Sequence, residues 1–244
     1  MGHGFYLRYN TPADAWRDAI PLGNGRLGAM VYGHTDIERI QLNDDSLWYG
    51  TFIDRNNEAL KEKLPEIRRL VLAWDIEHAE ELIMKYMVGT HAVMRHYTTL
   101  GVLNIAVNQH LPFVMGTLPN SESAEEYEMA LDLMTGVLDI RHKAAGVSYQ
   151  RQAFISHPAQ VMCMRYTADK PGAINLELYL NRVGISDAVG IDDRRPGRRV
   201  SFGGWPGTRV DSIRSIDGRT MLMRGNDAGV EFACAVRIAA DGEV

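Results

Sequence analysis

Alternation of apolar and polar residues with a period of two is the strongest structural signal in the chain. In "INLELYLN" the leucines and isoleucine fall on one face of an extended segment, and "VEFACAVRI" repeats the pattern. "VLDIRHKAAGVSYQRQAFIS" predicts two strands around the turn Ala144-Ala145-Gly146. Regular strands separated by turn residues favour a sandwich of antiparallel sheets.

A helical block interrupts this pattern. Ile67, Leu70 and Trp74 keep helical spacing, Pro65 suits a first-turn position, and Asp75 can begin a second helix that Gly89 ends. The 244 residues are therefore predicted to be mainly β, with one large antiparallel β-sandwich, similar to a supersandwich, and a short helical insertion near residues 58–88. We expect one domain over residues 1–244.

Charge and composition exclude several partners. The net charge of −5 supplies no electrostatic reason to expect nucleic acid or an anionic membrane as a partner. The basic run "DDRRPGRR" (residues 192–199) is interpreted as a solvated loop. No run approaches the ~20 apolar residues of a membrane span, and no signal peptide is visible, so a cytoplasmic location is expected unless a leader has been removed. The two cysteines lie in apolar alternating runs, which favours free thiols.

The segment "PLGNGRLGAMVYG" (residues 21–33) contains G-x-G-x-x-G at Gly23, Gly25 and Gly28. A dinucleotide-binding turn needs a helix that opens at the third glycine. Here the β-like "AMVYG" follows, which is too short for that helix. The glycines are interpreted as turn residues at a hairpin, and no nucleotide cofactor is predicted.

Signatures of other catalytic centres are absent from the sequence. It contains no G-x-S-x-G, no P-loop, no H-E-x-x-H and no paired C-x-x-C. His78 and Glu81 lie three residues apart on a predicted helix, but a solvated acidic face explains them better than a metal site. His91 and His96 flank a predicted loop and are weak evidence for ligands. We therefore predict no metal and no cofactor.

The segment "QLNDDSLWYG" leaves two interpretations open. In the first, an aspartate forms a turn and Trp48 packs into the core. In the second, the segment is a sugar-binding lip: Asn43 and Asp44 bind hydroxyl groups and Trp48 offers a flat apolar face to a sugar ring, with Asn24 and Arg26 as helpers. Asp44 and Asp45 are adjacent, so in an extended segment they cannot flank one glycosidic bond as acid and base.

Three segments in close order carry a resemblance to a known family. "AWRDAIPLGNGRLGAMVYG", "ERIQLNDDSLWYG" and "NNEALKEKLPEIRRLV" resemble the N-terminal domain of glycoside hydrolase family 95, the α-L-fucosidase family. "HYTTLGVLNI" and "VSYQRQAFISHPAQVMCMRYTADKPGAI" resemble its later segments more loosely. The resemblance covers nearly the whole chain.

The resemblance implies a β-sandwich placed ahead of an α/α-barrel that carries the catalytic carboxylates. It also implies inverting hydrolysis, in which an acid protonates the leaving oxygen while a base activates water. No catalytic residue transfers to this chain, which by itself is expected to be inactive. The implied partners are the C-terminal barrel domain and an oligosaccharide or glycoconjugate.

The chain also departs from the family pattern. Tyr49 replaces a small residue, Thr51-Phe52 replace a Gly-Pro, and Thr98 and Val102 replace a glutamine and an aspartate. These differences leave a related L-sugar such as L-galactose open as the substrate. A free-standing, non-catalytic carbohydrate-binding β-sandwich is the alternative function.

Overall fold

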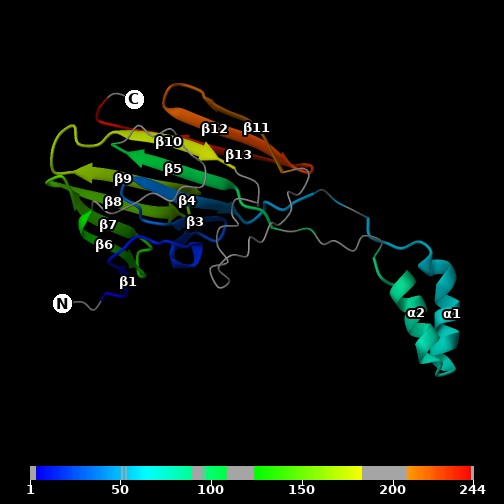
Figure 1. The fold of residues 1–244 in the computed structure, drawn as a ribbon. Helices are drawn as coiled ribbons and strands as arrows, with labels where there is room; N and C mark the ends of the chain where they lie inside the picture. Colours follow the sequence, from blue (N-terminus) through cyan, green and yellow to red (C-terminus); the bar gives the residue numbers. More distant parts are fainter. Residues whose placement is uncertain are drawn as a thin grey trace. The chain divides into compact units, whose positions relative to one another are not determined.

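The computed structural model describes residues 4–50, 52, 54–89, 95, 97–108, 124–182 and 208–242 (Figure 1). The chain divides into two compact units. The larger unit comprises residues 1–49 and 97–244, and the smaller comprises residues 50–96. All the sheets described below belong to the larger unit, and the two α-helices of the described residues belong to the smaller.

Three antiparallel sheets form the described part of the larger unit. The first has the order β1 (Tyr6–Tyr9), β6 (Glu125–Asp132), β7 (Leu138–Ala144), β8 (Val147–Ser156), β9 (Val161–Ala168). The second has the order β10 (Leu176–Asn181), β5 (Gly101–Val107), β4 (Ile37–Asp44), β3 (Leu27–Val31), β2 (Ile20–Gly23). The third contains β11 (Thr208–Ser215), β12 (Thr220–Asp227) and β13 (Val230–Arg237), and a one-turn helix, η1 (Trp16–Asp18), precedes β2.

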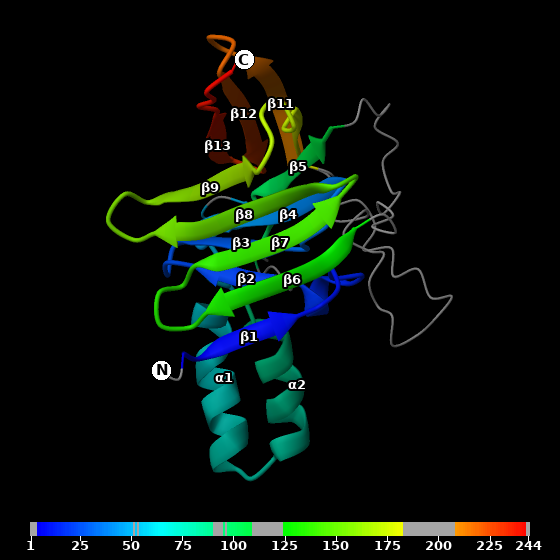
Figure 2. The same ribbon diagram turned by 90° about the vertical axis from the view of Figure 1, so that its left-hand side faces the viewer.

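The first two sheets pack face to face around one apolar core. Val31 and Ile40 from the second sheet and Met129 and Leu138 from the first are all completely buried in it. The third sheet lies on the side of β9 and β10 (Figure 1, Figure 2) and adds Met223 to the same core. This arrangement confirms the predicted mainly β sandwich.

The predicted period of two is visible in individual strands. Residues of β13 alternate strictly between partly buried and exposed, as its sequence pattern requires. β7 and β8 pair through to Ala144 and Val147, and the two residues between them, Ala145 and Gly146, have φ angles of 50° and 70°. Two consecutive positive φ angles match the twist of a tight hairpin, so this predicted turn is confirmed.

The glycine-rich segment forms a hairpin. Gly23 in β2 pairs with Gly28 in β3, and Gly25 occupies the turn with φ = 94°, a region that glycine enters without steric cost. A strand follows the third glycine where a dinucleotide-binding turn would need a helix. The hairpin interpretation is confirmed.

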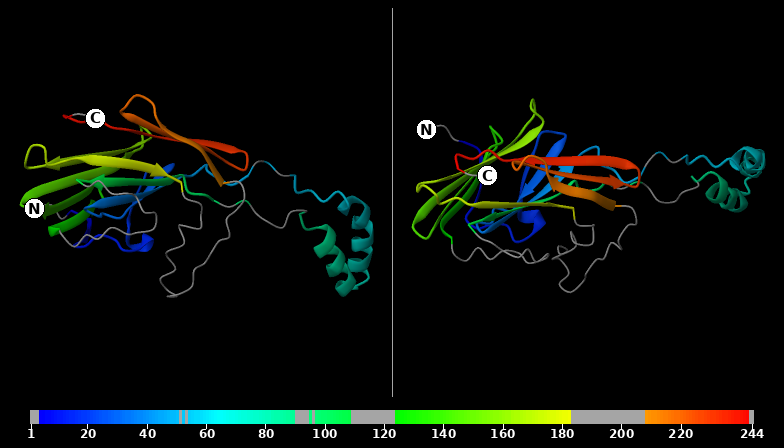
Figure 3. Two further views of the ribbon diagram at one scale, coloured as in Figure 1. Left: turned by 45° about the horizontal axis from the view of Figure 1, so that its top comes forward. Right: turned by 90° about the horizontal axis from the view of Figure 1, so that it is seen from above.

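The smaller unit is a helical hairpin of α1 (Leu60–Leu72) and α2 (Ile76–Tyr86), which lie side by side (Figure 3). Ile67 and Leu70 of α1 and Ala79 of α2 are buried. The expectation for Pro65 was wrong: α1 begins at Leu60, so the proline lies in the second turn, where it removes one backbone hydrogen bond. Burial of the apolar face of the helix compensates for this loss.

A buried ion pair joins the two large sheets. Arg151 of β8 donates from Nη1 to Oε2 of Glu38 in β4 at 2.6 Å, and their side chains are 3% and 0% exposed. Oε1 of Glu38 accepts hydrogen bonds from the backbone N–H groups of Gly33 and Arg39 at 2.9 and 3.0 Å. Burial raises the pKa of Glu38, while Arg151 and these donors oppose the shift.

The backbone at Gly33 completes this polar cluster. Its carbonyl accepts hydrogen bonds from Arg151 Nη2 at 3.1 Å and from the Tyr127 hydroxyl at 2.9 Å. Gly33 has φ = 83°, and a Cβ atom there would lie 2.4 Å from the Tyr127 hydroxyl oxygen. Only glycine satisfies both the backbone conformation and the close approach.

Removing one partner of the buried pair should destabilise the chain strongly. Glu38→Ala leaves the Arg151 guanidinium buried without its carboxylate, so we expect a loss of about 3–5 kcal/mol in the free energy of unfolding, measured by urea titration. Glu128→Ala is the matched control, because it breaks an exposed pair with Arg8 and should cost under about 1 kcal/mol. Equal losses in the two variants would contradict a specific role for the buried pair.

A buried histidine makes the fold sensitive to acid. His142 of β7 is 6% exposed and stacks on Tyr149, with ring centroids 5.0 Å apart. Burial, together with the nearby positive charge of Arg151, lowers the pKa of His142 to about 4. The folded chain therefore holds this imidazole neutral.

The pH dependence follows from the sign of this shift. Above pH 6.5 His142 is neutral in both the folded and unfolded chain. Between pH 6.5 and about 4 only the unfolded chain takes up the proton, so folding stability should fall on acidification by up to about 3 kcal/mol. Urea titrations across this pH range measure the effect. His142→Phe should reduce the slope, whereas the exposed-site control His157→Phe should retain it.

Candidate functional site

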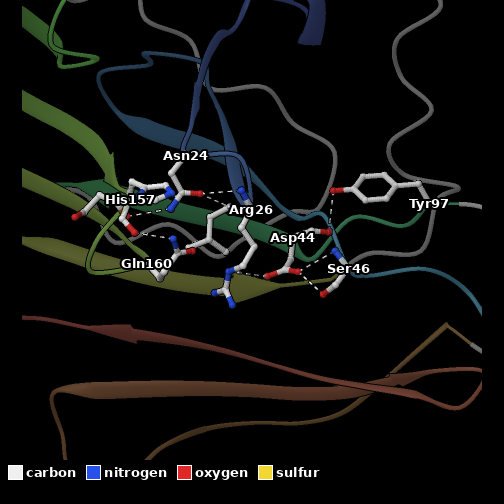
Figure 4. Close-up of polar contacts among 9 residues, drawn as sticks. Asn24, Arg26, Asp44, Ser46, Tyr97, His157 and Gln160 are labelled. Atoms are coloured by element: carbon white, nitrogen blue, oxygen red, sulfur yellow. Dashed lines mark hydrogen bonds and ion pairs between the residues drawn. The ribbon is translucent and has the colours of Figure 1, made fainter.

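The predicted site residues lie in two segments, the β2–β3 turn with Asn24 and Arg26, and the end of β4 with the turn after it; Figure 4 shows Asn24, Arg26 and Asp44. Asp44 is the last residue of β4, and its Oδ1 accepts hydrogen bonds from the backbone N–H and the hydroxyl of Ser46 at 3.1 and 2.5 Å. Its Oδ2 lies 3.8 Å from Nε of Arg26. Asp44 therefore shapes the turn and, with its side chain 18% exposed, still reaches solvent.

Asn24 has a structural role in the β2–β3 turn. Its Oδ1 accepts hydrogen bonds from the backbone N–H groups of Arg26 and Leu27 at 3.0 and 2.8 Å. Its Nδ2 donates to the carbonyl of Ser156 at 3.0 Å (Figure 4). These bonds use both ends of the amide, so Asn24 holds Arg26 in place and has little capacity left for a ligand.

The structure separates Asn43 from Asp44. Successive residues of a strand point to opposite faces, and Asn43 pairs with Gly28 whereas Asp44 pairs with Leu27. Oδ1 of Asn43 is buried and has no hydrogen-bond partner within the described ranges of the chain. The two side chains therefore face different environments, and a shared ligand contact by both stays an untested prediction.

Two partly exposed aromatic side chains, Trp48 and Tyr97, also belong to the site. Trp48 pairs with Tyr97 through an isolated β-bridge, and their rings meet edge to face with centroids 5.6 Å apart. They are 44% and 41% exposed. Trp48 Nε1 donates to the carbonyl of Asp45 at 3.0 Å, and the Tyr97 hydroxyl donates to the carbonyl of Asp44 at 2.9 Å. Burial raises the pKa of Tyr97, and the negative charges of Asp44 and Asp45 raise it further, so the phenol stays a donor.

We call Arg26, Asp44, Trp48 and Tyr97 the lip. It combines a carboxylate and a guanidinium with two partly exposed ring faces, a composition that suits a polyhydroxylated ring with one apolar side. Sequence analysis identified the first three residues and missed Tyr97. A tyrosine 49 residues beyond Trp48 gives no local signal, because only the fold brings the two rings together.

A buried network of hydrogen bonds and an ion pair holds the backbone that carries the two aromatic residues of the lip. The backbone N–H of Thr98 donates to the carbonyl of Leu47 at 3.1 Å, and its hydroxyl donates to Oδ2 of Asp227 at 2.6 Å. Asp227 forms a bidentate ion pair with Arg182, and both side chains are at most 1% exposed. Arg182 also donates from Nε to the carbonyl of Thr99 at 2.8 Å. The third sheet therefore fixes the backbone on both sides of the aromatic pair.

Of the histidines considered as metal ligands, the structure describes His78, which belongs to the helical hairpin. His78 Nδ1 contacts Oδ1 of Asp75 at 2.8 Å at the start of α2, which raises the pKa of His78 and lowers that of Asp75. His91, His96 and the basic run 192–199 lie outside the described residues. In the described part of the chain no group of three or more His, Cys, Asp or Glu side chains is placed to hold a metal ion, and no helix there is long and apolar enough to cross a membrane.

Comparisons with known proteins agree on one kind of enzyme. "Alpha-L-fucosidase 2" of Arabidopsis thaliana is 31% identical over 173 residues, which cover 70% of this chain and 19% of that protein. "Probable alpha-fucosidase A" of Aspergillus niger is 33% identical over 159 residues, and its namesake from Aspergillus oryzae is 26% identical over 163 residues. The chain spans about a fifth of the length of these relatives.

The sandwich fold and these relatives define the chain as an N-terminal domain of the glycoside hydrolase type. A family sequence model described as "Glycosyl hydrolase family 65, N-terminal domain" matches residues 7–244. The chain belongs to this family.

Loss of the Thr98 hydroxyl should weaken the support of the lip. Thr98→Val keeps the shape of the side chain but removes a donor to the buried Asp227 carboxylate, so we expect a loss of about 1–3 kcal/mol in the free energy of unfolding by urea titration. Thr167→Val is the matched control, because that hydroxyl makes only a long 3.4 Å contact with the carbonyl of Gln150. If both variants lose the same stability, the network does not have the proposed importance.

Proposed function

We propose that this chain is the N-terminal domain of an α-L-fucosidase of the glycoside hydrolase family 95 type. The parent enzyme would hydrolyse terminal α-L-fucosyl linkages, or those of a related L-sugar, with inversion. The observation that carries this proposal is the 31% identity with the Arabidopsis protein named alpha-L-fucosidase 2. Family 65 membership alone would leave the sugar open.

The position of the family-like segments in the fold supports this proposal. "PLGNGRLGAMVYG" forms β2, β3 and the turn that carries Arg26, while "ERIQLNDDSLWYG" forms β4 and the turn that carries Asp44 and Trp48. Strands β3 and β4 pair directly. The two segments with the most specific resemblance therefore supply three of the four lip residues, Arg26, Asp44 and Trp48.

The lip residues suit substrate binding, and acid–base catalysis would fall to the rest of the enzyme. Trp48 and Tyr97 would pack against the apolar face of a sugar, and Arg26 and Asp44 would bind hydroxyl groups. Acid–base cleavage needs two carboxyl groups on opposite sides of one glycosidic bond. The Asp44 carboxylate already contacts Ser46 and Arg26. Asp45 is the next residue in the chain, so Asp44 and Asp45 do not supply two carboxyl groups on opposite sides of one bond. We assign the acid and the base to the barrel domain of the parent enzyme.

Substitution in the natural gene product tests the role of the lip. Trp48→Ala should raise KM for an α-L-fucoside about 3- to 10-fold and change kcat little, because it removes a stacking surface and leaves the acid and base intact. Steady-state kinetics with an aryl α-L-fucoside measure both constants. Trp16→Ala is the matched control, since Trp16 is also 44% exposed but lies outside the lip.

Three outcomes would contradict parts of this proposal. An unchanged KM in Trp48→Ala would remove the lip from the substrate site. Hydrolysis of α-L-galactosides in place of fucosides would replace the proposed sugar. A natural product of this length that binds fucosylated glycans without hydrolysing them would favour the free-standing carbohydrate-binding sandwich.

A further inference from the structure

The connection between α1 and α2 exposes a concentrated set of apolar side chains. Residues 71–76, which we call the hairpin tip, include Leu72 and Trp74, with 82% and 85% of their surfaces exposed. Val71 and Ile76 are 44% and 48% exposed. Asp75 is the only charged residue in this segment. Contiguous exposed apolar surface of this kind marks interaction sites in soluble proteins.

The backbone at the hairpin tip adopts, at Trp74, a conformation that glycine usually occupies. The N–H of Asp75 donates to the carbonyl of Leu70 at 3.0 Å, and the N–H of Trp74 donates to the carbonyl of Val71 at 3.1 Å. These two bonds form a Schellman motif, in which the residue at the position of Trp74 adopts a left-handed conformation and is usually glycine. Trp74 has φ = 57° and occupies a region that bulky side chains rarely adopt.

Folding of the hairpin does not explain this tryptophan. Its backbone conformation favours glycine, and its side chain gains little from burial within the hairpin, where Ile67, Leu70 and Ala79 form the contact. A strained backbone that carries an exposed aromatic side chain is a reason to look for a binding role. Tryptophan is also the residue type most enriched among the dominant contacts of protein interfaces.

We infer that the hairpin tip is a docking surface that inserts Trp74 and Leu72 into an apolar pocket on the parent hydrolase beyond this domain. The inference rests on the proposed function, since it requires that larger enzyme. The lengths of the relatives argue for this docking partner. Each relative is about five times longer than the segment it shares with this chain, and the matching family is one of N-terminal domains. The hairpin tip is thus an intramolecular domain contact.

Charges around the hairpin tip favour a protein partner over a lipid surface. Arg68 and Arg69 on α1 are exposed, and so are Glu77, Glu80 and Glu81 on α2. An apolar centre with a rim of both signs is the usual composition of a protein interface. The three carboxylates fall within the first six residues of α2 and oppose insertion into an anionic membrane.

Hydrogen exchange in the natural gene product tests this inference. In the wild type, peptides covering residues 70–77 should exchange more slowly than in the 244-residue chain, because docking removes their amides from solvent. Trp74→Gly should abolish that difference. Met84→Gly is the matched control: Met84 is also apolar, is 65% exposed on α2, and lies outside the hairpin tip, so the protection should remain.

Thermal unfolding gives a second test. The sign of the change in melting midpoint on Trp74→Gly distinguishes docking from a structural role. In the 244-residue chain Trp74→Gly should leave the melting midpoint unchanged or raise it, because glycine suits the left-handed position. In the natural product the same substitution should lower the midpoint, because a domain contact is lost. A fall of equal size in both would assign Trp74 a structural role and overturn the inference.

Other outcomes also overturn it. The proposed occupant is excluded if the hairpin tip is equally protected in both forms, or if its protection depends on protein concentration. It is also excluded if protection appears only with anionic lipid vesicles, or if the natural product is no longer than this chain. Activity of the wild-type natural product on α-L-fucosides is measured in parallel. If the enzyme is active but its hairpin tip is unprotected, only the docking inference is contradicted. If the hairpin tip is protected but the enzyme is inactive on L-sugars, only the proposed substrate is contradicted.

Discussion

The ion pair between Glu38 and Arg151 is the interaction on which the sandwich depends. Each charge is buried in the space between two sheets, where an unpaired charge would be strongly destabilising. The two residues are 113 positions apart in the chain, so the pair forms only when β4 and β8 face each other in the correct register. The carbonyl of Gly33 and the hydroxyl of Tyr127 complete the cluster, which makes the alignment of the sheets specific in a way that apolar contacts alone would not.

A second buried pair performs the same task for the lip. Trp48 and Tyr97 lie on short segments that have only an isolated bridge between them. Their position comes from Thr98, which joins the Leu47 carbonyl to Asp227, and from Arg182, which holds that carboxylate. The third sheet therefore contributes to the candidate site without supplying a surface residue to it. Substitutions there should change the lip indirectly, through its backbone.

The two units use their exposed aromatic residues differently. In the larger unit one main core collects most of the buried apolar residues of the strands, and the exposed aromatic residues of the lip are held by hydrogen bonds. In the helical hairpin, Leu72 and Trp74 of the hairpin tip are 82% and 85% exposed, and Trp74 adopts a conformation suited to glycine. Local folding energetics explain the first arrangement. For the second we infer a partner, which the greater length of the relatives suggests lies on the parent enzyme beyond this domain.

Sequence alone determined the class of fold and several of its helices and strands. Alternation with period two marks β13, and helical spacing marks α1 and α2, because these patterns express local geometry that each segment carries by itself. It also placed Asp44 and Trp48 in one segment, but it misplaced the start of α1, since packing outweighed the proline. Only the tertiary structure brought Tyr97, Arg182 and Asp227 to the lip and paired Glu38 with Arg151. These contacts join residues far apart in the chain, and no local pattern records which distant residue satisfies a buried charge.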